Sequence, residues 1–156
     1  MMNDTAKSIL LEKLKAQFMV KGHCGMVTPQ LTFEETVKLI ETPKGVEHCT
    51  KYNLPTLDLL TALRSEAPEY WYIEQEGVNL TNPTTAILVG AFTEDATIIV
   101  DGTNDAHIIM LHGATAHIIA RDFATIRIDR AEDTKTTITK EGKNAFIYDN
   151  YYNRKG

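Results

Sequence analysis

Apolar and polar residues alternate with helical spacing through the first third of the chain. Ile9, Leu10, Leu14 and Phe18 recur every three or four positions, with lysine and glutamine between them. This spacing predicts an amphipathic helix over residues 5–20, with one apolar side.

Three later segments carry the residues that start helices. Thr32-Phe33-Glu34-Glu35 has the form of a capping box, in which the threonine hydroxyl and the glutamate carboxylate each accept from the other residue's backbone N–H. Thr42 precedes Pro43, and proline is well tolerated at the first helical position. A further helix is expected from Thr56 to Arg64. Residues 1–68 are therefore predicted to form a helical unit.

The period changes at Ala86, and residues 69–156 are predicted to form a second, β-repeat unit. Short β-branched segments alternate with turn residues such as Asp101-Gly102 and His112-Gly113. Four segments align at spacings of ten, ten and eight residues, namely 96–99, 106–109, 116–119 and 124–127. Less regular copies lie at 86–89, 136–139 and 145–148. Self-similarity of this kind is typical of repeat architectures.

Two folds fit the repeat, and both make the whole chain an α+β protein. The first is a short β-solenoid, like a right-handed β-helix, in which two segments form a coil of about 18–20 residues. The second is an antiparallel β-sandwich or meander. The alanine that recurs ahead of the isoleucines favours the solenoid, because a tight corner admits a small side chain. We then expect Ile98 to stack on Ile118, and Ile108 on Ile126, about 4.8 Å apart.

Aromatic residues gather at both ends of the β part and are the predicted partner-binding residues. The first group is expected to cap the solenoid against the helical unit. The second lies on a terminal coil whose backbone groups would otherwise stay unpaired. We expect this second group to pair with another copy of the chain, giving a homo-oligomer. The residues are Tyr70, Trp71 and Tyr72 in the first group and Phe146, Tyr148, Tyr151 and Tyr152 in the second.

The net charge of −5 lies entirely in the β part. The helical third is neutral, so neither region offers the basic face that phosphate-backbone binding requires, and nucleic acid is not an expected partner. No apolar run approaches the roughly 20 residues of a membrane span. No leader segment is recognisable either, so we expect a cytoplasmic protein with reduced cysteines.

Histidines and cysteines form the candidate metal ligands. His23-Cys24 and His48-Cys49 could supply the four ligands that zinc prefers, but neighbouring residues on a helix diverge by about 100° and do not chelate one ion together. We therefore predict no metal and no cofactor.

Three histidines and several acidic turns lie in the β part. His107 and His117 are expected on opposite sides of the solenoid, His117 near Thr97 and His107 near Thr125, with His112 between the two histidines in sequence. The acidic turns are interpreted as ordinary turn chemistry rather than as a calcium site. They are Glu94-Asp95, Asp101 with Asn104-Asp105, and Glu132-Asp133.

No catalytic signature is present, and the sequence favours a non-catalytic protein-binding or scaffolding module. One concrete version is a small acidic inhibitor or decoy of another protein. The first alternative is a DNA-binding regulator that uses a helix-turn-helix-like segment at 43–64, although the second helix is short of base-reading side chains. The second alternative is a small β-helix hydrolase or lyase. Its candidate charged cluster is Arg121, Asp122, Arg127, Asp129 and Arg130.

Overall fold

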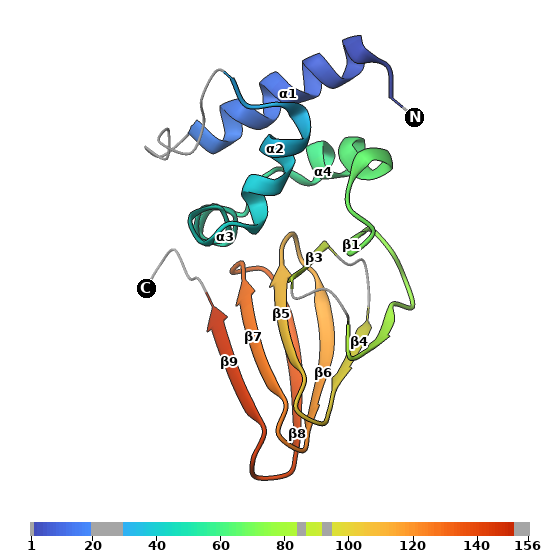
Figure 1. The fold of residues 1–156 in the computed structure, drawn as a ribbon, viewed down its shortest axis with the longest axis vertical. Helices are drawn as coiled ribbons and strands as arrows, with labels where there is room; N and C mark the ends of the chain where they lie inside the picture. The colour runs from blue at the N-terminus through green and yellow to red at the C-terminus, as the bar shows by residue number, and fades with distance from the viewer. Residues whose placement is uncertain (1, 20–29, 84–86, 92–94, 152–156) are drawn as a thin grey trace.

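The chain forms a helical region followed by a parallel β-solenoid, as the pattern of residues predicts (Figure 1). The structure is a computed structural model, and it describes residues 2–19, 30–83, 87–91 and 95–151. The helices lie over one end of the strands, and the arrowheads of β5, β7 and β9 point toward them. The antiparallel sandwich or meander is therefore excluded.

The helices begin where their capping residues predict. Thr32 and Glu35 form the complete capping box, and the Thr42 hydroxyl accepts from the Gly45 backbone N–H ahead of the third helix. On the first helix, Leu14 and Phe18 are buried, whereas Ile9 faces solvent. The helical elements are α1 (Asp4–Met19), α2 (Phe33–Lys38), η3 (Leu39–Glu41), α3 (Pro43–Tyr52), α4 (Leu57–Leu63) and η4 (Arg64–Glu66).

The strands alternate between two sheets, and every neighbouring pair is parallel. Sheet A has the order β1-β3-β5-β7-β9, and sheet B the order β2-β4-β6-β8. This order is that of a solenoid, because each coil adds one strand to each sheet. The strands are β1 (Trp71–Ile73), β2 (Asn79–Thr81), β3 (Ile87–Ala91), β4 (Ala96–Val100), β5 (Asp105–Met110), β6 (Thr115–Arg121), β7 (Thr125–Arg130), β8 (Lys135–Glu141) and β9 (Phe146–Tyr151).

The first coil is slightly shorter than the next, because Trp71 pairs with Val89 whereas Ile98 pairs with Ile118. The expected stacking of Ile98 on Ile118 is thus confirmed. The expected pairing of Ile108 with Ile126 is wrong, because Ile108 lies beside Ile128 and Ile126 beside Ala106. Aligning the repeats on alanine caused the error. Ala124 occupies the corner before β7 rather than the start of a strand.

One column of corner residues has the left-handed backbone conformation. Asn82, Gly102, Asp122 and Gly142 recur once per coil and have φ values of 47°, 60°, 54° and 105°. Glycine, asparagine and aspartate tolerate positive φ better than other residues. The same twist therefore recurs at each of these corners and keeps the coils in register.

Two hydrophobic clusters form the core. One fills the solenoid with stacked isoleucine, valine and alanine, including Ile98, Ile118 and Ile128. The other joins the helices to one side of the solenoid, through Trp71, Ile109, Leu111 and residues of α1–α4. The second cluster contains residues of both regions. This packing does not test the domain boundary predicted at residue 68, which stays a prediction.

The helical region packs against several coils of the solenoid and not against the first coil alone. α3 packs against β5 and β7, which belong to later coils. The Asn53 side-chain oxygen accepts from the His112 backbone N–H at 2.9 Å, at the corner after β5. The expectation that these helices cover the N-terminal coil is thus corrected: they lie across the corners of several coils.

Candidate binding surface on the last coil

The last coil of the solenoid, here called the C-terminal coil, consists of β8, the corner 142–145 and β9. Phe146 and Tyr148 lie on the outer face of β9, at positions paired with Thr125 and Arg127. Their ring centroids are 5.1 Å apart, and 56% and 53% of the two residues is exposed. These two side chains, the aromatic pair, form an apolar area on a strand at the edge of sheet A.

The other predicted aromatic group lies at the opposite edge of the same sheet. β1 and β9 are the first and last of five strands, so about 19 Å separates them at about 4.8 Å per strand. Trp71 is buried against the helices, and Tyr70 is half-buried between the two core clusters. Burial and a hydrogen bond with Glu41 raise the pKa of Tyr70 to about 12. Tyr72 is half-buried against the solenoid core, so the structure does not bring the two groups together.

The apolar core is open at the C-terminal coil. Ile118 is fully buried, whereas the next residue in the same row, Ile138, is 39% exposed. Ile147, on β9 in the other sheet, is half-buried against the solenoid core. Among the described residues, no strand pairs with the free side of β8 or β9. Backbone N–H and C=O groups therefore face outward along both strands, and such edges accept an added strand.

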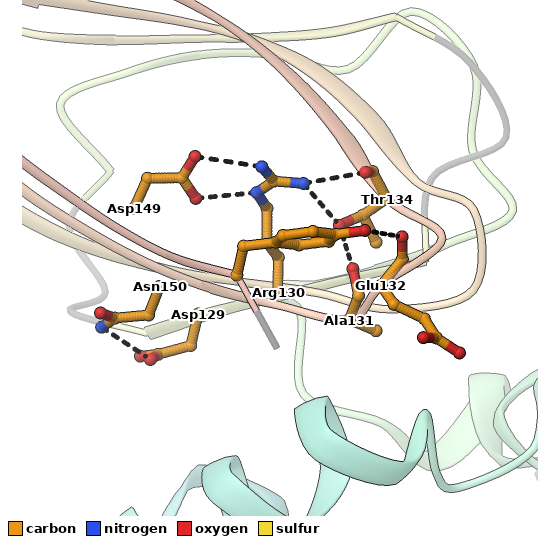
Figure 2. A network of polar contacts seen from close by, with 8 residues as sticks. Asp129, Arg130, Ala131, Glu132, Thr134, Asp149 and Asn150 are labelled. Atoms are coloured by element: carbon orange, nitrogen blue, oxygen red, sulfur yellow. Dashed lines mark hydrogen bonds and ion pairs between the residues drawn. The ribbon is translucent and has the colours of Figure 1, made fainter. Parts of the chain in front are cut away.

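An ion pair joins β9 to the preceding strand of sheet A, as Figure 2 shows for Arg130 and Asp149. The Arg130 guanidinium binds both carboxylate oxygens of Asp149, at 2.7 and 3.2 Å, and donates to the Thr134 carbonyl oxygen at 2.9 Å. The Tyr151 ring lies 4.3 Å from the guanidinium carbon, and its hydroxyl donates to the Glu132 carbonyl oxygen. Tyr151 therefore contacts Arg130 and Glu132 of its own chain, and these polar groups at the end of the core have partners.

A buried carboxylate lies beside the aromatic pair. Asp129 is fully buried on the outer face of β7, with His107 Nε2 at 2.5 Å and the Arg127 Nε–H donating at 2.9 Å to the same oxygen. Asn150 donates to the other oxygen at 3.1 Å. Burial alone raises the pKa of Asp129, but hydrogen bonds from His107, Asn150 and Arg127 outweigh it, so that the pKa lies below its usual value.

His107, Arg127 and Asp129 form a charged cluster around the buried carboxylate. All three are candidate residues of the sequence, but the sequence did not predict that His107 lies with the other two. His107 is opposite Arg127, not near Thr125 as expected, since one complete coil separates His107 from Arg127. The signal that could have found the cluster is the column of corner residues, whose even spacing gives the register directly. His117 does lie beside Thr97, in the opposite sheet from His107, as expected.

The five charged residues considered for catalysis do not form one site. Arg121 pairs with Glu141 on sheet B, and Asp122 accepts from the Gly102 backbone N–H at a corner. Arg130 belongs to the end of the core, which leaves Arg127 and Asp129 as the neighbouring pair. The exposed side of α4 carries Asp58, Thr61 and Ala62 with Arg64 following, so the structure adds no base-reading side chains there.

Of the four candidate zinc ligands, His48 and Cys49 lie within the described residues. Cys49 and His48 are buried in α3, and burial raises the pKa of the Cys49 thiol. His23, Cys24, Glu94 and Tyr152 lie outside the described residues. Within the ranges the structure covers, no three histidine, cysteine or acidic side chains come together as metal ligands would. Asp101 instead exchanges two hydrogen bonds with Asn82, which joins neighbouring corners.

Comparison of the chain with protein-family models, curated proteins and solved structures gave no match. In the described part of the chain, no helix has the length and apolar character needed to cross a membrane.

Proposed function

We propose that this chain is a non-catalytic protein-binding or scaffolding module, and that it binds its partner with the C-terminal coil. The observation that carries the proposal is the pair of exposed aromatic residues on a strand edge with no neighbour among the described residues. The cytoplasmic location expected from the sequence stays part of this proposal.

The chemistry of the C-terminal coil supports binding of another protein. Aromatic side chains are enriched at the centres of protein interfaces. Burying the exposed half of Phe146 and Tyr148 removes roughly 100 Å² each from water, which stabilises a complex by about 2–3 kcal/mol per ring. The adjacent Arg127 side chain, 58% exposed, adds a polar rim.

The test compares two variants that each remove exposed apolar area. In Phe146→Ala/Tyr148→Ala, the proposed surface is truncated. In the control Ile9→Ala, a residue on α1 with 53% exposure is truncated instead. Each tagged protein is incubated with extract of its source cells, and captured proteins are quantified by mass spectrometry.

We expect a partner to be captured by the wild-type chain and the control and lost in the double variant. Circular dichroism checks that all three proteins are folded. Equal capture by the double variant would refute the proposal, as would a wild-type chain that captures no protein above a tag-only sample and does not bind a second copy of itself.

A further inference from the structure

We propose that the partner of the C-terminal coil is a second copy of this chain, joined so that β9 of each copy pairs antiparallel with β8 of the other. This inference rests on the proposed function and deepens it. It follows from the directions of the two strands, their charges and the exposed end of the core.

The backbone of the C-terminal coil shows which groups are free. Lys135 donates its backbone N–H to Ala114, and Phe146 donates to Ala124, so these residues face the preceding coil. Since alternate residues of a parallel strand face opposite neighbours, the groups of Ile138 on β8 and Ile147 on β9 point to the open end. These two residues also direct their side chains into the core, where their partners in register are Ile118 and Ile126.

A two-fold axis parallel to the strands matches both open edges at once. β8 and β9 lie in different sheets and run in opposite directions along the coil (Figure 1). Rotation about such an axis places the second copy's β8 beside β9 in the same sheet, and its β9 beside β8 in the other. Both new pairs are antiparallel and equally spaced, as a symmetric interface requires.

The alternative axis, which pairs β9 with β9 and β8 with β8, fits less well. β9 lies half a coil further along the solenoid than β8, so one of these pairs would be about 4.8 Å wider than the other.

In the proposed pairing, here called the mixed pairing, β8 of one copy lies beside β9 of the other and not beside its own counterpart. β8 carries Lys135, Lys140 and Glu141, whereas β9 carries Asp149 as its one charged residue. Asp149 is already bound by Arg130, so joining two copies buries no unpaired carboxylate. The exposed part of Ile138 meets Ile147 of the second copy, and each sheet becomes continuous over nine strands, five from one chain and four from the other.

The first test is the oligomeric state of the full chain, measured by sedimentation velocity over a concentration series. We expect the mass to rise from 17.5 kDa to twice that value. In the variant Ile138→Lys, which places a charge at the open end of the core, the dissociation constant should increase at least tenfold.

The matched control is Thr103→Lys, which adds the same charge at an exposed position in the corner between β4 and β5, two coils before the open end. It should dimerise with a dissociation constant within about threefold of the wild type, since its side chain lies two coils away from the proposed interface. Circular dichroism confirms that both variants fold. A monomer at every concentration, or equal weakening by both variants, would refute the inference.

The second test determines which strands meet. A photoreactive phenylalanine analogue replaces Tyr148, and isotopically labelled and unlabelled chains are mixed before irradiation. We expect crosslinks between chains to reach residues 135–141, whereas crosslinks to residues 146–151 would refute the mixed pairing.

The two proposals fail in different ways. A monomer that still captures another protein, and loses it in Phe146→Ala/Tyr148→Ala, would refute the second copy as partner and leave the proposed function standing. A monomer whose capture does not depend on these residues would refute both.

Discussion

Replacing Ile118 by alanine should destabilise the protein far more than the same replacement at Ile138. The two residues are neighbours in one row of the solenoid core and lie in the same sheet. They differ in position along the solenoid: Ile118 lies between Ile98 and Ile138, whereas Ile138 has an open end on one side.

The expected magnitudes follow from burial. Ile118 is fully buried, and a fully buried isoleucine typically loses about 2–5 kcal/mol when truncated to alanine, through lost burial and the cavity left behind. Ile138 is 39% exposed, so truncation removes about three-fifths of the roughly 2.4 kcal/mol that three buried carbon atoms contribute. No enclosed cavity forms at the open end. The expected cost there is about 1–1.5 kcal/mol.

Urea denaturation of the wild type and both variants measures these costs, at a protein concentration low enough to keep the chain monomeric. A difference of about 2 kcal/mol between the variants is expected. Equal costs would contradict a core that ends at Ile138. If two copies join as proposed, the cost at Ile138 should increase with protein concentration while the cost at Ile118 stays constant, because pairing buries Ile138.

Three further predictions concern the carboxylate, the corners and the helical region. Asp129→Asn should lower the free energy of unfolding by about 1–3 kcal/mol at pH 7, because it removes a buried charge that accepts three hydrogen bonds. Because the folded pKa of Asp129 is lowered, its contribution to the free energy of unfolding is present above its unfolded pKa of about 3.9 and is lost as the pH falls through the folded value. Between pH 6 and pH 2, the free energy of unfolding should therefore decrease less in the variant than in the wild type. Equal decreases would contradict this. Gly102→Ala should lower the free energy of unfolding by about 1–2 kcal/mol in chemical denaturation, because φ at this position is 60°. Gly102→Asn should lower it less, since asparagine tolerates positive φ. Equal losses in the two variants would argue that the left-handed conformation of the corner residues does not matter. Asn53→Gly keeps the left-handed conformation at the end of α3 but removes the hydrogen bond to the His112 backbone N–H. Amide hydrogen exchange should therefore become faster in α3 and α4 and stay unchanged in β6 and β8. Faster exchange in all of these elements would show that the helices and the solenoid open together.

The proposed interface uses the part of the solenoid that the helices leave uncovered. α3 packs against β5 and β7, and the second core cluster covers the outer face of sheet A at Trp71 and Ile109. Phe146 and Tyr148 lie beyond that cover, on the last strand of the same sheet. The described helices therefore leave Phe146 and Tyr148 exposed.

The order of elements is already determined by local features of the sequence. The capping residues Thr32 and Thr42 satisfy backbone N–H groups within three residues, so the helices they start depend on no distant contact. Short β-branched segments at a regular spacing have the same local character. These features predicted the helical third, the strands and the choice of a solenoid.

The register of the coils was decided by packing. Ala106 and Ala124 look equivalent in sequence, yet Ala106 begins a stacked row with Ile126 while Ala124 fills a corner. Each coil returns the chain to the same place because Gly102 and Asp122 adopt the same left-handed twist, and alanine content carries no information about that twist.

The tertiary structure alone decided which candidate residues share a surface. Tyr70 and Tyr148 belong to similar aromatic groups in the sequence, but they lie near opposite edges of sheet A, and the helices bury the first group and not the second. Asp129 is buried because its outward-facing strand position lies on a strand covered by α3, while Ile138 is exposed because the row of isoleucines ends there. Hydrophobicity is a property of each residue, but exposure depends on what the rest of the chain places against it, and that is why only the folded protein shows which of the two predicted aromatic groups is exposed.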